Sequence, residues 1–169
     1  MYKVKVLFLF LLAVAHVNLT FAQRSDVEEL KNEVKAAKSA LKSELGNLRF
    51  DGSKVTYYEV QREAGFKDLE VILFLRESYT LFFNGDASQN KVALRIYDKP
   101  SEDPTRILLY EVKNISKKTR SVSEKDLNQQ LSFYVQNPDR LRTVYIEYEV
   151  SRGRNPDRGA LVMMLGYEN

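Results

Sequence analysis

Three arginines lie close together near the C-terminal end of the sequence, in the segment RGRNPDRG, which also holds two glycines. They are Arg152, Arg154 and Arg158. A guanidinium group can donate two parallel hydrogen bonds to a phosphate, sulfate or carboxylate, and glycine lets backbone amides approach the same anion. The segment predicts a loop that binds an anionic ligand. A hairpin tip whose arginines contact only water is the alternative.

Tyrosine is the second residue type that could bind a ligand. The sequence has ten tyrosines and nine phenylalanines but no tryptophan. In residues 143–150, Tyr145 alternates with apolar residues and is expected on the outer face of a sheet. An exposed tyrosine can contact a sugar ring or a partner protein, although tyrosine is also common in strands for structural reasons. Tyr145 and the three arginines are the predicted binding residues.

Two carboxylates share the outer face of residues 143–150 with Tyr145. Glu147 and Glu149 are two residues apart, which on a strand is about 6–7 Å and suits the paired acids of glycoside hydrolases. Exposed acids on a sheet face are more often solvated or paired with lysine and arginine. We therefore expect both to point to solvent and predict no enzymatic activity, with a hydrolase as the least favoured hypothesis.

Another segment rich in oxygen ligands joins two strand-like stretches. Asp98, Glu102 and Asp103 lie within six residues. Calcium is held by several oxygens, which a loop at the end of a β-sandwich can supply, as in C2-like domains. Lys99 and two prolines interrupt the ligand pattern, which favours a stiff, solvated turn. No cofactor is predicted, and these carboxylates are only weak candidates for a metal.

The first 22 residues have the pattern of an export signal. Two lysines precede an apolar run at 6–17, and small residues near Ala22 provide a cleavage site before Gln23. The run is shorter than the roughly 20 apolar residues that cross a bilayer. An uncleaved N-terminal anchor is the alternative.

Removal of this signal changes which chemistry the chain can perform. It takes away His16, the only histidine, and lowers the formal net charge from +3 to +1 in a chain that has no cysteine. Catalysis by serine–histidine or cysteine–histidine pairs and zinc sites built from these ligands are then excluded. The balanced charge also argues against a nucleic-acid partner.

The cleavage context Phe21-Ala22-Gln23 resembles that of exported envelope proteins of the Bacteroidetes type, in which glutamine commonly follows the cut. The lack of cysteine also fits a bacterial envelope, because small secreted eukaryotic domains usually rely on disulfides. The resemblance implies a small exported protein that is periplasmic or extracellular.

Residues 25–48 have the apolar spacing of an amphipathic helix. Apolar side chains recur three or four residues apart, at Val27, Leu30, Val34, Ala37, Leu41, Leu45 and Leu48. Ser25 with Glu28 matches a capping box, and Gly46 is a stop signal. The stripe could pack against its own domain or pair with a second copy as an oligomer stalk. Because the heptad pattern slips after Leu41, we favour packing within the domain.

From residue 55 onward, short apolar segments alternate with turn residues. Eight strands are expected, at 55–61, 69–75, 79–83, 92–97, 107–112, 131–135, 143–150 and 160–165. Residues 69–75 are apolar at nearly every position, which predicts a central strand or one covered by the N-terminal helix. Ser123 and Asp126 predict a single helical turn that carries the chain from one sheet to the other.

These patterns predict a mainly β fold, an antiparallel β-sandwich of the jelly-roll or immunoglobulin-like type preceded by one amphipathic α-helix. The expected organisation is a signal peptide at 1–22, the helix at 23–49 and the sandwich at 50–169. The predicted function is non-enzymatic binding or scaffolding in the cell envelope, with an envelope protein or a glycan as partner. A binding module for a carbohydrate or an anionic glycan is the alternative. No stable membrane span is expected after cleavage, and a homo-oligomer through the helix is the alternative to packing within the domain.

Overall fold

The computed structural model describes residues 27–59, 63–74, 77–152 and 158–168, so the expected signal peptide lies outside the described residues. Helix α1 covers residues 27–44. The elements that follow are β1 (Arg49–Glu59), β2 (Gly65–Ile72), β3 (Ser78–Asn84), β4 (Val92–Tyr97), β5 (Leu108–Val112), β6 (Thr119–Ser123), α2 (Glu124–Ser132), β7 (Thr143–Val150) and β8 (Arg158–Glu168).

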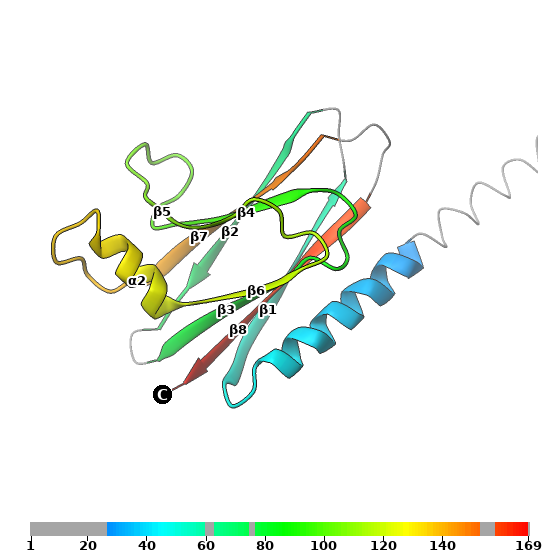
Figure 1. Ribbon diagram of the computed structural model, residues 1–169, viewed down its shortest axis with the longest axis horizontal. Coiled ribbons are helices and arrows are strands. Elements are labelled where there is room, and N and C mark those ends of the chain that lie inside the picture. Colours follow the sequence, from blue (N-terminus) through cyan, green and yellow to red (C-terminus); the bar gives the residue numbers. More distant parts are fainter. Residues whose placement is uncertain (1–26, 60–62, 75–76, 153–157, 169) are drawn as a thin grey trace, which may run out of the picture.

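The strands form two four-stranded antiparallel sheets. Sheet A has the order β1-β8-β3-β6, and sheet B has the order β2-β7-β4-β5. Figure 1 shows α1 lying alongside β1 and β8. The predicted antiparallel β-sandwich with one N-terminal helix is therefore confirmed. Neither helix in the described part of the chain is both long and apolar enough to span a membrane.

Strand β8 is buried on both faces. The side chains that point between the two sheets are Leu161, Met163 and Leu165. Those that face α1 are Ala160, Val162 and Met164. Because a strand alternates its side chains between the faces of a sheet, a strand with two buried faces must be apolar almost throughout. The run ALVMML in β8 meets this requirement.

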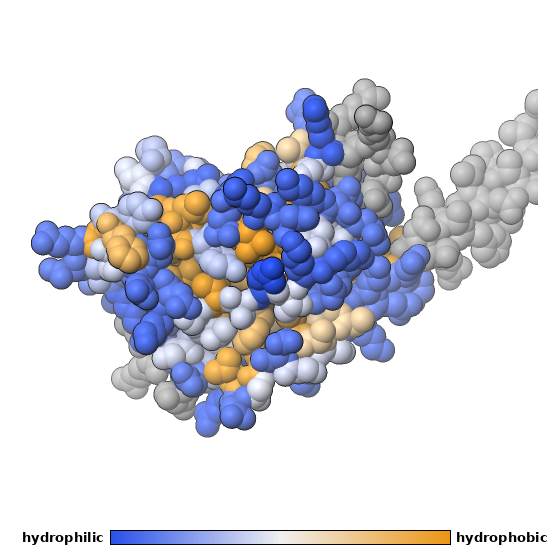
Figure 2. Space-filling model, viewed as in Figure 1, coloured by the Kyte–Doolittle hydropathy of each residue, from blue (hydrophilic) through white to orange (hydrophobic). Residues whose placement is uncertain are grey.

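Helix α1 packs its apolar stripe on the outer face of sheet A. Figure 2 shows hydrophilic side chains, in blue, over much of the face that it presents. The apolar stripe of α1 instead packs against the strands of sheet A. Val34, Ala37, Leu41 and Leu45 are buried there against residues of β3 and β8. The chain turns after the helix at Gly46, which has a φ of +57° that glycine adopts without strain. The prediction that this helix packs within its own domain is confirmed.

Helix α2 closes one open side of the sandwich. It contacts β3, β5 and β6, and it starts with the expected capping box, in which Ser123 and Asp126 bond to each other's backbone amides. The crossover is confirmed, since β6 belongs to sheet A and β7 to sheet B. It has nine residues rather than the expected single turn.

The prediction of a strand at 131–135 is wrong, because α2 extends to Ser132 and a turn follows. Leu127 and Leu131, four residues apart, both reach the core from one face of the helix. Strand β6 was not predicted, because its sequence carries little apolar signal. Its sequence, TRSVS, holds one buried residue, Val122, and it forms a strand because it pairs with β3 along its whole length.

The prediction that residues 69–75 are central or covered by the helix is also wrong. Strand β2 is at the edge of sheet B, and Ile72 and Phe74 are each 60% exposed. Helix α1 covers the other sheet, so these outward side chains remain largely exposed. The last two strands do not form a hairpin either, because β7 and β8 belong to different sheets.

Candidate functional site

The outer face of sheet B carries a row of charged residues that crosses all four strands. The register places Asp68 of β2 opposite Glu147 of β7, Glu147 opposite Arg95 of β4, and Arg95 opposite Glu111 of β5. Directly opposed side chains on one face of a sheet are about 5 Å apart at Cβ, within reach of an ion pair. Pairing between strands therefore brings together residues that are far apart in the sequence.

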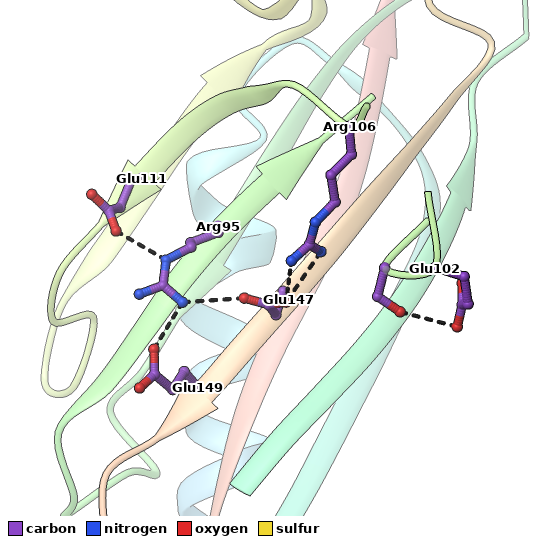
Figure 3. Close-up of polar contacts among 7 residues, drawn as sticks. Arg95, Glu102, Arg106, Glu111, Glu147 and Glu149 are labelled. Atoms are coloured by element: carbon purple, nitrogen blue, oxygen red, sulfur yellow. Dashed lines mark hydrogen bonds and ion pairs between the residues drawn. The ribbon is translucent and has the colours of Figure 1, made fainter. Parts of the chain in front are cut away.

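Glu147 is at the centre of this row and is only 7% exposed. Its Oε1 accepts a hydrogen bond from Nη1 of Arg95 at 3.1 Å, and its Oε2 accepts two from Arg106 at 3.2 and 3.3 Å. Figure 3 shows the two arginines converging on Glu147 from different elements. The expectation that Glu147 points to solvent is wrong, because two long side chains lie over it.

Arg95 links Glu147 to the two neighbouring carboxylates. Its Nε lies 3.0 Å from Glu111, and its Nη1 lies 2.8 Å from Glu149. These bonds, to Glu149 first and then to Glu111, raise the pKa of the Arg95 guanidinium above its ordinary value, although burial opposes them. Arg95 is therefore held in one position as a permanent charge at the centre of the face.

Arg106 comes from the loop that joins β4 to β5, residues 98–107. Its guanidinium carbon lies 4.0 Å from the ring centroid of Tyr97, a cation–π contact. Burial, and then the carboxylate of Glu147, raise the pKa of Tyr97, whereas Arg106 acts in the opposite direction. Arg106 therefore links the loop to the sheet. Because its pKa is raised, Tyr97 is a neutral phenol at physiological pH.

Glu147, Arg106 and Tyr97 help to line a cavity of about 210 Å³ on the outer face of sheet B, which we call the sheet B pocket. Carboxylates, two tyrosines and one arginine dominate its walls. The lining residues are Asp68, Leu69, Glu70, Tyr97, Pro100, Ser101, Glu102, Arg106, Tyr145, Ile146 and Glu147. The pocket can offer hydrogen-bond acceptors, one fixed donor group and aromatic surface to a small polar ligand.

The Glu147 and Glu149 pair does not have the arrangement of two hydrolytic carboxylates. Both bind the same nitrogen of Arg95, and the second oxygen of Glu147 is bound by Arg106. A glycosidase needs one acid that delivers a proton to the leaving group and one that attacks or activates water. In the structure, both oxygens of Glu147 are instead bound by Arg95 and Arg106.

The three carboxylates weighed as calcium ligands do not converge on one point. Asp98 accepts a hydrogen bond from the backbone amide of Ile107 at 2.6 Å, and Asp103 accepts from the amide and hydroxyl of Thr105. Glu102 instead lies beside Ser101 and lines the sheet B pocket. In the described chain, no group of three or more acidic, histidine or cysteine residues is placed to hold a metal ion.

The structure separates the residues that were predicted to bind together. Tyr145 lines the sheet B pocket, whereas Arg158 lies at the start of β8, where its Nε is 2.7 Å from Glu59. Arg152 is exposed just after β7, and Arg154 lies outside the described residues. Because five residues along β7 separate Tyr145 from the end of the strand, about 16 Å, Tyr145 and Arg158 belong to different surfaces.

Sequence reasoning missed Arg95 and Arg106. The alternation of residues 92–97 would have placed Arg95 on the outer face of its strand. No sequence pattern shows that this strand pairs with β7, which is about 50 residues further along, or that the loop turns Arg106 back over the sheet. The partners of Glu147 depend on strand order, which local spacing does not assign.

The sequence matches no protein-family model and no curated protein. Among solved structures, the chain is similar to a carbohydrate-binding module of the endoglucanase Cel5A from Eubacterium cellulosolvens, with 11% identity, a TM-score of 0.37, and coverage of 72% of this chain and 95% of that one. It is also similar to a structure of Bacillus endospore appendages, which are disulfide-linked pili (13%, TM-score 0.33, 72% and 90%). TmCBM61 in complex with β-1,4-galactotriose is a third (11%, TM-score 0.31, 74% and 90%). These likenesses are distant, and none bears on the ligand of this chain.

Proposed function

We propose that this is a non-enzymatic binding protein, exported to the bacterial cell envelope, whose sheet B pocket binds a carbohydrate. The export signal pattern of residues 1–22 supports the location. The observation that carries the proposed ligand is the convergence of Tyr97, Tyr145, Arg106 and several carboxylates on one pocket of about 210 Å³. That volume suits one sugar unit of a longer glycan that continues along the open sheet face.

The chemistry of the pocket fits a polyhydroxylated ligand. Carboxylates accept hydrogen bonds from hydroxyl groups, and a guanidinium donates to hydroxyl oxygens. The pocket is also preorganised, since Glu147 is held by both Arg95 and Arg106 before any ligand arrives. Fixed polar groups reduce the entropy that is lost when a ligand binds.

Tyr145 is the residue that we expect to stack on the sugar. The ring of Tyr97 already carries the Arg106 guanidinium, whereas Tyr145 is half-buried and lies directly across from Tyr97 in the sheet. A tyrosine ring offers an apolar face to the C–H groups of a sugar and a hydroxyl to its polar edge. The expected binding residues are therefore Tyr145, Glu102 and Arg106.

The test is a glycan array followed by calorimetric titration of the sugars that bind, with wild type, Tyr145→Ala and Tyr134→Ala. We expect Tyr145→Ala to weaken binding at least tenfold. Tyr134 is more exposed than Tyr145 and lies in the turn after α2, so Tyr134→Ala should bind as wild type does. Failure of every glycan to bind, or wild-type affinity in Tyr145→Ala, would overturn the proposal.

A further inference from the structure

A second and larger cavity lies on the side of the sandwich that α2 does not close. Its volume is about 680 Å³, within the range of about 300–1,000 Å³ that is usual for small-molecule sites. It opens where α1 begins, β1 ends and β2 begins, beside the end of β7 and the start of β8. It shares no lining residue with the sheet B pocket.

Apolar side chains from three elements line this cavity while remaining open to solvent. Tyr57 of β1 is 55% exposed, Phe66 of β2 is 57% exposed, and Val27 of α1 is 37% exposed. Leu30 lies one helical turn further along α1 and is half-buried. Exposed aromatic and aliphatic groups that line one hollow would lose unfavourable contact with water if an apolar group filled it.

The charged residues of the cavity are mostly positive. Lys31, Lys67 and Arg158 line it, with Glu59 as the only acid among its described lining residues. Glu59 binds Nε of Arg158, and a guanidinium has four further N–H groups on its terminal nitrogens. Lys31 pairs with Glu28 at 3.5 Å, but both are more than 60% exposed, so solvent screens that pair strongly.

The floor of the cavity is rigid. Tyr58 and Val150 are buried members of the core, and the Tyr58 hydroxyl is hydrogen-bonded to the buried hydroxyl of Ser88. Gly159 packs so closely on this hydroxyl that a Cβ atom there would overlap it. The cavity therefore combines a fixed, largely apolar floor with exposed cationic side chains at its rim, an arrangement suited to a ligand with one apolar part and one charged part.

We propose that this cavity is a binding site for a small anionic amphiphile, a molecule with an apolar or aromatic body and one carboxylate, sulfonate or phosphate group. The body contacts Tyr57 and Phe66, and the anionic group meets Arg158 and Lys67. The three cations and one carboxylate among its described lining residues favour this ligand class over neutral or cationic amphiphiles. The site is independent of the proposed sheet B function, and either could fail without the other.

Two fluorescent probes that differ only in charge test the proposal. The first is 8-anilinonaphthalene-1-sulfonate, and the second is N-phenyl-1-naphthylamine, which has the same aromatic body without the sulfonate. Titrated into the folded protein, the sulfonate probe should bind at one site at least tenfold more tightly than the neutral probe. Equal affinities, or several equivalent sites for the sulfonate probe, would overturn the proposal.

Variants then assign the binding to this cavity. Arg158→Gln combined with Lys67→Gln should reduce the affinity for the sulfonate probe about tenfold and leave the neutral probe unchanged, whereas Phe66→Ser should weaken both. Phe133→Ser, which removes another exposed aromatic side chain directly after α2, is the control and should change neither. Because such probes also bind partly unfolded chains, each variant is first shown to keep the wild-type urea midpoint. Wild-type sulfonate binding in Phe66→Ser would contradict the proposed site.

Discussion

Arg106 donates to Oε2 of Glu147 from both of its terminal guanidinium nitrogens, at 3.2 and 3.3 Å. This contact ties the loop at residues 98–107 to a central strand of sheet B, 41 positions further along the chain. It also covers the carboxylate, which explains why Glu147 is buried on a face that otherwise contacts solvent. The shape of the sheet B pocket depends on this pair.

Replacing Glu147 by glutamine should destabilise the fold and loosen the loop. The variant keeps the side-chain size but leaves Arg95 and Arg106 without their shared carboxylate, which should cost about 1–3 kcal/mol. Urea unfolding should show a lower midpoint with an unchanged slope. Glu111→Gln is the matched control, because Glu111 is more exposed and, among the described residues, forms an ion pair with Arg95 alone. Its expected loss is below about 1 kcal/mol. Equal losses in the two variants would contradict this account.

Leu41→Ala should cost about 2–5 kcal/mol in the free energy of unfolding, because it removes a fully buried side chain between α1 and sheet A. The neighbouring Lys42 is exposed, and Lys42→Ala should change stability by no more than about 0.5 kcal/mol. Light scattering should give the same molar mass for wild type and Leu41→Ala. If Leu41→Ala lowered the molar mass but left the stability unchanged, the stripe would instead act between chains.

Gly85→Ala should destabilise the protein because no space exists for a methyl group. A Cβ there would overlap the backbone carbonyl oxygen of Ile115 and approach its carbonyl carbon to 2.9 Å. Backbone cannot move aside as a side-chain end can, so we expect a loss of about 1–3 kcal/mol, measured by thermal unfolding. At Gly52 nothing lies within 4 Å of the position that a methyl group would occupy, and Gly52→Ala should leave the melting temperature nearly unchanged. A similar fall in both would argue against the clash.

Alkaline pH should unfold the protein through its buried and half-buried tyrosines. Burial raises the pKa of Tyr148, Tyr97 and Tyr110 above 10.0, so the folded state holds these phenol protons to a higher pH than the unfolded chain does. The resulting stability is fully present below about pH 10 and is lost as the pH rises beyond it. Urea midpoints should therefore be similar at pH 8 and 9 and fall at pH 11.

The phenolate absorbance at 295 nm provides the direct check. In urea, all tyrosines should ionise near pH 10, whereas the folded protein at the same pH should show a smaller signal. Tyr148→Phe should lessen the difference between the two titrations. Coincident titration curves for folded and unfolded protein would contradict the assignment.

Local patterns predicted the elements that carry their own signal. The stripe of α1, the Ser123 capping box and the alternation in β7 each follow from residues adjacent in sequence, so spacing was sufficient. The errors occurred where pairing overrides local preference. Strand β6 forms because it pairs with β3. Residues 131–135 are largely apolar but form no strand, because Leu131 belongs to α2 and packs into the core from that helix.

The candidate site shows the same division more sharply. By itself, the sequence determined the fold class and the outward direction of Tyr145, Glu147 and Glu149, because side-chain periodicity depends only on neighbouring residues. Only the tertiary structure decided that Arg95 and Arg106 cover Glu147 and that Tyr145 and Arg158 lie on different surfaces. It also decided that the apolar segment at 69–72 belongs to an edge strand. Strand order and loop closure are long-range properties, fixed by which sheets and helices bury the most apolar surface together, and no local spacing records them.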